Sequence, residues 1–513
     1  MARYKYYSYE QTILVAIAYS KQILQGTLEY AISWLINNRV DLSIFECKYR
    51  NDETGAPAWD PAIMLKIVLF AYSRGIYSSR KIACACRENI LFKALSADSE
   101  PHFTTIASFI SSTVDQVIPI FRNILMVCSE LGLIGGNMFA LDGCKMSSNA
   151  SKEWSGTFND LMKKKEKFEE TIKFLIEKHR ETDEREGKKE SEKENEKKQI
   201  ERIRQKVEKI ERFLAENEPK IGSRGREKQS NITDNESAKM KTSHGMVQGY
   251  NGLAIADSKH QIIINPEVFG SGQEGEYLQQ MVEGAKDTAE SIGLGKNYFK
   301  GKKFIADTNN FSEDNTKYLS EEEVDAYIPD QQFRNRDPRF KTRDRHRPEK
   351  KERYKAKDFT YDENNDSFIC PTGKILKFER IQNFNNTEGR FYRAKLTDCR
   401  SCKLRENCLK SYKSRQRSLY IIEKFFNRNY SEEMIKKIDT IEGRNLYSKR
   451  MGIIEPVFGN IVSSKGLNRF TLRTKLKVNI QWVLYCLVHN IEKICNYGDM
   501  SEYDNDLQLN DSS

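Results

Sequence analysis

Three short apolar segments of this chain each end in an aspartate: FALD at Asp142, GLAIAD at Asp257 and KFIAD at Asp307. A carboxylate at the end of a buried strand is costly unless it is paired or bound, so each aspartate needs a physical reason. The four residues before Asp142 are all apolar, which is typical of a strand buried on both faces. We therefore expect Asp142 to stand at the end of a buried strand.

One of the three aspartates has a simple explanation. Asp257 opens DSKHQ, a short polar connection between two apolar runs, and Asp suits such turns. Asp142 and Asp307 have no comparable reason. Strand ends of a mixed α/β sheet converge on a crevice, so we expect these two carboxylates to lie side by side. Carboxylates so placed repel unless a cation separates them, and Mg²⁺ prefers oxygen ligands. The pair therefore predicts a site for a divalent cation.

A third carboxylate, Glu455, lies in RMGIIEPVFGN among apolar residues. Phe458 and Val462 follow three and seven residues later, a spacing that predicts a place on the core-facing stripe of a helix. Pro456 fits only the first turn of a helix or a kink, so we expect the helix to start or bend at the glutamate. Three carboxylates could hold two ions about 3.5–4 Å apart, the arrangement used for in-line attack on phosphorus.

The order of elements predicts the fold class. From residue 138 to 330 the sequence reads as a strand, a hairpin of strands, an amphipathic helix and two further strands, which indicates a mixed α/β sheet. Residues 1–125 read as helical, and Asp60 before Pro61 predicts a helix start that Gly75 ends. This part has the character of a helix-turn-helix module, either binding DNA ends or serving as a scaffold without DNA contact.

Residues 158–216 have a different pattern. Apolar residues recur there at helical spacing in two blocks, and the segment between the blocks, RETDEREGKKESEKENEKK, has no apolar residue. Two helices with matching seams and a charged tip predict a projecting helical hairpin. Such a hairpin could mediate the pairing of protomers or contact DNA, or it could have no binding role. The seams consist of Leu161, Phe168 and Leu175 in the first block and Ile200, Ile203, Val207, Ile210 and Leu214 in the second.

Positive charge is concentrated in two segments of a chain whose net charge is +10. Residues 331–360 hold twelve Lys and Arg against five Asp and Glu, and residues 461–479 add five basic residues and no acid. Basic residues interleaved with Phe and Tyr suit nucleic acid, which offers phosphates outside and base faces inside. A solvated loop is the alternative for the first segment.

Eleven cysteines, with no export signal in MARYKYYSYEQ, indicate reduced thiols or metal ligands rather than a disulfide framework. No apolar run approaches the ~18 residues of a membrane helix, so we expect a cytoplasmic protein without a membrane partner. Four cysteines are clustered in a polar region and could close a tetrahedral zinc site, with packing of reduced thiols as the alternative. These are Cys370, Cys399, Cys402 and Cys408.

Several pieces in one order resemble a bacterial insertion-sequence transposase of the DDE class, over residues 45–495. They are DPAIMLKIVLFAYSRGIYSSRKI, LDGCKMSSNASK, DSKHQIIINPEV, ADTNNFSEDN and IEPVFGNIVSSKGLNRFTLR. The resemblance implies an RNase H-like catalytic core, a helical N-terminal domain, and an acidic triad that binds Mg²⁺ or Mn²⁺. Carried over, the triad falls on Asp142, Asp307 and Glu455.

The resemblance also implies a function. Such an enzyme binds the terminal inverted repeats of its element, cuts there as an endonuclease and joins the freed 3′ end to target DNA. Its partners are double-stranded DNA, at the element ends and target, and at least one further copy of itself, in the bacterial nucleoid. A repressor that binds DNA without cutting is the alternative, and a structure-specific nuclease is a third reading. Related transposases place a Tyr, an Arg and a Lys near the glutamate, here Tyr447, Arg450 and Lys465; we expect phosphate contacts from Arg450, Lys465, Arg469 and Arg473.

The composition shifts predict a division of the chain. We expect a helical N-terminal domain at 1–130; a catalytic core at 131–157 and 236–330, completed by helices at 431–497; an inserted hairpin at 158–235; a basic, Cys-containing insertion at 331–430; and a disordered acidic tail at 498–513.

Overall fold

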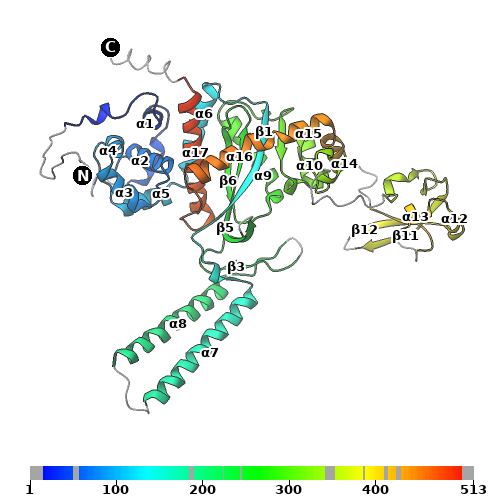
Figure 1. The fold of residues 1–513 in the computed structure, drawn as a ribbon, viewed down its shortest axis with the longest axis horizontal. Helices are drawn as coiled ribbons and strands as arrows, with labels where there is room; N and C mark the ends of the chain where they lie inside the picture. The colour runs from blue at the N-terminus through cyan, green and yellow to red at the C-terminus, as the bar shows by residue number, and fades with distance from the viewer. Residues whose placement is uncertain are drawn as a thin grey trace, which may run out of the picture. The chain divides into compact units, whose positions relative to one another are not determined.

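The computed structural model describes residues 16–49, 57–183, 190–222, 225–242, 245–340, 353–384, 387–409, 414–422 and 429–499. The predicted acidic tail lies almost wholly outside these residues, as does much of the first basic segment. The chain forms two compact units (Figure 1). The first comprises Met1–Asn310, Glu322–Ala326 and Leu446–Ser513, and the second Phe311–Glu321 and Tyr327–Asn445.

The first unit is built on a mixed sheet with strand order β4-β5-β1-β7-β8, and β6 also pairs with β5. Its central strand, β1, is antiparallel to β5 and parallel to β7. The sheet confirms the predicted mixed α/β class. Its strands are β1 (Met138–Ser147), β4 (Ala238–Thr242), β5 (Gly245–Asp257), β6 (Ile263–Phe269), β7 (Lys303–Ala306) and β8 (Asp325–Tyr327).

Helices cover both faces of this sheet. Trp482 of α17 (Lys475–Tyr497) packs so closely on β5 that a Cβ at Gly252 would come 2.9 Å from its ring. On the other face, the Met281 carbonyl of α9 (Leu278–Ser291) accepts a hydrogen bond of 3.0 Å from Asn265 of β6. Neighbouring residues of a strand point to opposite faces, so one strand pair binds both helices.

The N-terminal helices pack against α17, where Tyr72 and Tyr485 stack at 4.5 Å. The predicted helix start is confirmed, because the Asp60 carboxylate accepts the Ala62 N–H at 2.7 Å and caps the helix at Pro61. Gly75 follows with a φ of +70°, which glycine adopts without strain. The helices are α1 (Leu28–Asn38), α2 (Pro61–Ser73), α3 (Ser79–Glu88), α4 (Ile90–Leu95), α5 (Phe103–Ser112) and α6 (Val117–Glu130).

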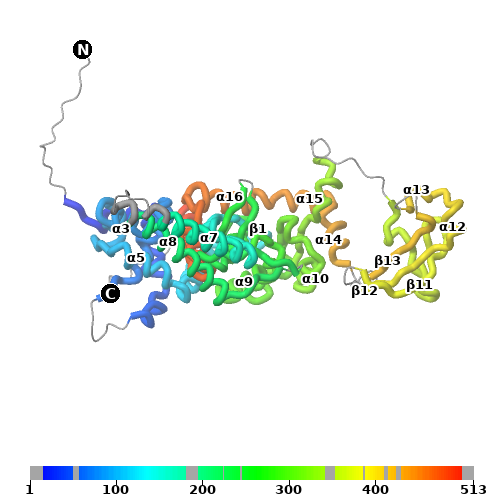
Figure 2. The backbone as a smooth tube through the Cα atoms, turned by 90° about the horizontal axis from the view of Figure 1, so that it is seen from below, coloured from blue at the N-terminus to red at the C-terminus, as the bar shows by residue number. Residues whose placement is uncertain are grey.

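The inserted segment forms two long helices, α7 (Phe158–Asp183) and α8 (Glu190–Glu216), which lie side by side in Figures 1 and 2. Leu161, Ile210 and Phe213 form a small buried cluster near their base. Two short strands, β2 (Ser155–Gly156) and β3 (Ser230–Asn231), pair where the hairpin leaves the body. The centre of the predicted charged tip lies outside the described residues.

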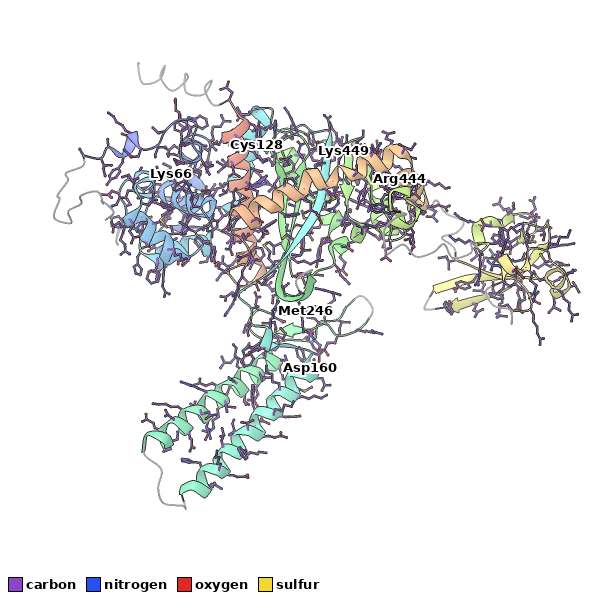
Figure 3. The ribbon with its side chains drawn as sticks, viewed as in Figure 1. Lys66, Cys128, Asp160, Met246, Arg444 and Lys449 are labelled. Carbon is purple, nitrogen blue, oxygen red and sulfur yellow. The ribbon has the colours of Figure 1, made fainter. Side chains whose placement is uncertain are left out.

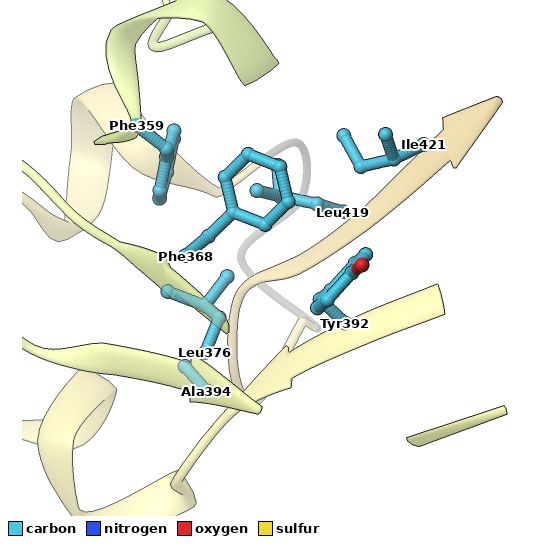
Figure 4. Packing of buried hydrophobic residues seen from close by; sticks show 7 residues of the cluster. All are labelled: Phe359, Phe368, Leu376, Tyr392, Ala394, Leu419 and Ile421. Carbon is cyan, nitrogen blue, oxygen red and sulfur yellow. The ribbon is translucent and has the colours of Figure 1, made fainter. Parts of the chain in front are cut away.

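The second unit contains an antiparallel sheet in the order β13-β12-β11-β10-β9. One buried apolar cluster holds it together (Figure 4): Phe359, Phe368, Leu376, Tyr392, Ala394, Leu419 and Ile421. The strands are β9 (Thr360–Asp362), β10 (Ser367–Ile369), β11 (Ile375–Phe384), β12 (Thr387–Ala394) and β13 (Ser418–Ile422).

This unit also contains a helix, α14, that the sequence-based division assigned to the catalytic core. It packs on α10, a helix from the other end of the same unit. The helices are α10 (Glu313–Glu321), α11 (Phe333–Arg336), α12 (Leu396–Arg400), α13 (Arg405–Cys408) and α14 (Tyr430–Ile438), followed along the chain by α15 (Ile441–Ser448) and α16 (Arg450–Phe458).

Candidate active site

The register of β1 and β7 brings the first two predicted carboxylates together. The two strands are parallel, and the last paired residues are Leu141 and Ala306. The next residue along each strand is Asp142 and Asp307, so the two aspartates lie side by side. Asp307 comes just after β7 ends, but the expectation that Asp142 ends its strand is wrong, because β1 continues to Ser147 by pairing with β5. The residues before Asp142 are fully buried, as their sequence predicts. Both carboxylates therefore leave the core at one point.

Asp142 lies in a largely dry and strongly polar environment. Its side chain is 15% exposed; one carboxylate oxygen accepts the Gly143 N–H at 2.9 Å, and the other pairs with Arg450. The pKa of Asp142 is raised to about 6, mainly by burial and to a smaller extent by the negative charge of Glu274, although Arg450 and the Gly143 N–H oppose both. The site thus disfavours a bare carboxylate and favours one next to positive charge.

Arg450 is the first residue of α16, and its side chain is only 13% exposed. Burial alone would lower the pKa of Arg450, but the charges of Asp142, Tyr447 and Asp307 outweigh burial and raise it. The guanidinium therefore acts on both aspartates. The predicted Arg is at the site, and in this structure it binds a carboxylate.

Glu455 does not lie on the core-facing side of its helix, contrary to the prediction. Its neighbours Ile453, Ile454, Val457 and Phe458 are buried, whereas Glu455 is exposed. The glutamate is nevertheless close to β1. The pKa of the Cys144 thiol, two residues beyond Asp142, is raised to about 11 by burial and then by Asp142, Glu274 and Glu455.

The helix also does not start at the glutamate. α16 begins at Arg450 and contains Pro456 in its interior, and a π-helical stretch, Gly459–Ser464, follows it. A proline inside a helix removes one N–H and crowds the carbonyl four residues earlier. That earlier residue is Gly452, which has open space where a side chain would be. The proline thus lies within the helix rather than at its first turn.

Within the described residues, no group of three or more His, Cys, Asp or Glu side chains is arranged to hold a metal ion. Asp142 and Asp307 are nevertheless hard oxygen donors in register on adjacent strands, which suits Mg²⁺ or Mn²⁺. The structure brings these two together and leaves Glu455 on the adjoining helix, turned to solvent.

A further carboxylate, Glu274, was missed by the sequence analysis. It is 4% exposed in the 3₁₀ turn Glu274–Glu276, accepts a hydrogen bond of 3.2 Å from Asn251 and lies 3.3 Å from the Lys145 ammonium. The turn packs on the residues just after Asp307, since a Cβ at Gly275 would come 2.4 Å from the Asn309 carbonyl. The segment GSGQEGE has no strand pattern, so nothing in it signalled a buried acid.

Two of the predicted basic residues lie beyond the end of β1. Arg469 donates to the Ser148 carbonyl at 3.1 Å, and Arg473 donates to the Asn149 carbonyl at 3.1 Å. Both are exposed, and neither pairs with a carboxylate among the described residues. Their positive charge is available to a ligand.

Lys465 is different, and the predicted phosphate contact has no support in its surroundings. Its side chain is 1% exposed, and its ammonium donates to Glu492 at 2.6 Å and to Asn460 at 2.8 Å. Burial lowers the pKa of Lys465. The ammonium is therefore used inside the fold, where a phosphate does not reach it.

The four clustered cysteines come together in the second unit as free thiols. The pKa of Cys408 is raised by burial, and the charges of Cys399, Cys402 and Cys370 raise it further against the opposing charge of Arg417. The Cys370 sulfur accepts the Lys374 N–H at 3.3 Å, and the Cys399 sulfur accepts the Arg417 N–H at 3.4 Å. The sulfurs of the described residues are not arranged as a metal-binding group.

Two protein-family models match the chain. One, described as a transposase DDE domain, covers residues 369–495, which include Arg450, Glu455 and the four clustered cysteines. The other, described as a transposase domain (DUF772), covers residues 18–112 in the N-terminal helices. No curated protein and no solved structure matches. None of the described helices combines the length and apolar character needed to cross a bilayer. The two matches, in this order along a mixed α/β fold, indicate an insertion-sequence transposase of the DDE class.

Proposed function

We propose that this transposase binds the terminal inverted repeats of an insertion sequence and catalyses metal-dependent DNA cleavage and strand transfer at Asp142, Asp307 and Glu455. The observation that carries the proposal is the parallel register of β1 and β7, which brings the two carboxylates next to each other where β7 ends. Arg450 beside them supplies positive charge. An acidic pair with a neighbouring guanidinium suits phosphoryl chemistry, which depends on position and charge.

Asp142 and Asp307 would hold the divalent ions, Mg²⁺ or Mn²⁺, and Glu455 would complete the set. Bound in a pair, such ions supply charge that activates an attacking oxygen and stabilises a leaving oxygen. The exposed Glu455 side chain has rotational freedom that the buried neighbours on α16 lack. When DNA binds, Arg450 would release the Asp142 carboxylate and hold an oxygen of the scissile phosphate instead.

The DNA partner follows from the basic groups beside the site. Arg469 and Arg473 bind the carbonyls of Ser148 and Asn149 just after β1, and these carbonyls lie six and seven residues beyond Asp142. They would contact double-stranded DNA at the element ends or the target. Joining two ends in one reaction requires at least two copies of the chain, so we propose a dimer or higher oligomer on DNA, in the nucleoid of the bacterial cytoplasm.

The test is cleavage of a duplex copied from the inverted repeats beside the gene, with Mg²⁺ present. Asp142→Asn removes the charge and keeps the shape, so cutting should be lost while binding remains. Asp287→Asn makes the same change at an exposed position of α9 and should cut normally. Cutting by Asp142→Asn at the wild-type rate would remove this residue from the active site. Binding without cutting by the wild-type chain would favour the repressor alternative.

A further inference from the structure

A cleft of about 570 Å³ in the first unit is lined by lysines and has no acidic residue in its lining. Its walls come from β4, from the loop after β6 and from the segment that follows the helical hairpin. Met246, labelled in Figure 3, lies at the start of β5 and lines the cleft. The lysines are Lys145, Lys220, Lys228, Lys239 and Lys241.

The lysines on β4 are poorly compensated. Lys239 and Lys241 are exposed and flank the buried Met240, so both ammonium groups leave the same side of the strand. Together with the exposed Lys228, they form no ion pair with any carboxylate in the described ranges. Residues two apart on a strand lie about 6.6 Å apart, a spacing comparable to that of successive phosphates on a DNA strand.

The pKa of Lys220, deeper in the cleft, responds to the charges around it. Burial lowers the pKa of Lys220, and the charge of Lys228 lowers it further, although Asp234 and Glu236 oppose them. Lys220 also donates to the Asn235 carbonyl. A cleft that gathers ammonium groups in this way repels cations and concentrates anions.

The cleft adjoins the catalytic carboxylates. β5 runs past the end of β1, and its Gly249 pairs with Ser147 on one side and with Ala238 of β4 on the other. Lys145 lies on β1 three residues after Asp142, and its ammonium is 3.3 Å from Glu274, the acid that raises the pKa of Asp142. The Lys145 side chain thus links the lysine cleft to Glu274.

We propose that the lysine cleft binds the sugar-phosphate backbone of duplex DNA next to the scissile phosphate, with Lys239 and Lys241 each contacting a phosphate. This inference rests on the proposed function, because it takes the carboxylates at β1 and β7 as the place of cutting. A single small anion would engage only one or two of the ammonium groups. Lysines spread over three segments of chain match a ligand that carries a row of phosphates.

The test is the salt dependence of binding to a mixed-sequence duplex, which does not require cutting. The double substitution Lys239→Gln/Lys241→Gln should weaken binding at low salt and make the plot of log K against log salt shallower by about 2, or about 1 per lost phosphate contact. Lys163→Gln/Lys296→Gln removes two exposed lysines that lie outside the cleft and should leave the slope unchanged. Both proteins should show the wild-type circular dichroism spectrum.

The outcomes separate the two proposals. If the folded Lys239→Gln/Lys241→Gln protein keeps the wild-type salt dependence of DNA binding, the proposal that the cleft binds DNA is wrong. This holds whatever Asp142→Asn does to cutting. A shallower salt dependence in this variant, together with normal cutting by Asp142→Asn, would support DNA binding at the cleft and contradict the proposed catalytic site. An equally shallow salt dependence in the Lys163→Gln/Lys296→Gln control would also contradict DNA binding at the cleft, because the effect would then reflect net charge alone.

Discussion

The guanidinium of Arg450 pairs with the carboxylate of Asp142, although 308 positions of the chain separate them. The contact exists because α16 crosses the sheet against β1 and β5, with Ile454 and Val457 buried beneath it. Arg450 therefore reaches Asp142 from the same helix that carries Glu455. Pairing at this point offsets the burial that raises the pKa of Asp142.

Replacing Arg450 should damage cutting more than folding. In Arg450→Ala the buried Asp142 loses its cation, and the scissile phosphate loses a charge, so we expect cutting to fall roughly 10²–10³-fold. Arg450→Lys keeps the charge without the planar fork and should fall in between. The measurement is the single-turnover rate of end cleavage. Lys449→Ala changes the exposed neighbour, labelled in Figure 3, and should cut normally. A normal rate in Arg450→Ala would separate this residue from the reaction.

We propose that the cysteine cluster closes around zinc, although the sulfurs of the described residues are not arranged as a metal-binding group. The thiols of Cys370, Cys399, Cys402 and Cys408 act on one another, and two of the sulfurs accept backbone N–H groups. Protein purified without chelators should contain one zinc ion per chain by elemental analysis, and Cys399→Ser should lose it. Cys495→Ser, in the other unit, serves as the matched control. Zinc-free wild-type protein, or zinc retained by Cys399→Ser, would show that the cysteines only pack.

His489 should make the fold sensitive to acid. The ring is 1% exposed, bonds to the Gln261 carbonyl at 2.9 Å and to Asn460 at 2.9 Å, and burial lowers its pKa to about 3. Above pH 6.5 the ring is neutral in both the folded and unfolded chain, so it has no effect on stability there. As the pH falls from 6.5 toward 3, only the unfolded chain takes up the proton, and stability is lost.

The size of this effect can be isolated by substitution. Between pH 7 and pH 5 the ring should remove roughly 2 kcal/mol from the free energy of unfolding. His489→Gln retains a donor and an acceptor but does not titrate, so its loss over this pH range should be smaller by that amount in urea denaturation. Equal losses in both proteins would show that His489 is not the group that titrates.

Short-range patterns predicted much of the fold. The apolar run before Asp142, the run before Asp307 and the Asp60 cap each lie on a buried or capped element, because their signals depend on residues near in sequence. The predicted orientation of Glu455 was wrong, because spacing alone could not show which side of a helix containing Pro456 faces the sheet.

Contacts that depend on tertiary packing could not be predicted from the sequence. Glu274 is buried only because its 3₁₀ turn packs on the residues after Asp307 and beside Asn251. Lys465 is enclosed because Glu492, on a different helix, pairs with it. Neither partner lies near in sequence, so no local spacing indicated either contact.

The central claim is that Asp142 and Asp307 share divalent ions during cutting, and a change of ligand tests it most directly. Thiolates bind softer ions better than they bind Mg²⁺. The Asp142→Cys and Asp307→Cys proteins should therefore lose end cleavage in Mg²⁺ and regain part of it in Mn²⁺, whereas Asp287→Cys should cut equally in both. Wild-type cutting in Mg²⁺ by either active-site variant, or loss that Mn²⁺ leaves unchanged in both, would contradict a shared metal site.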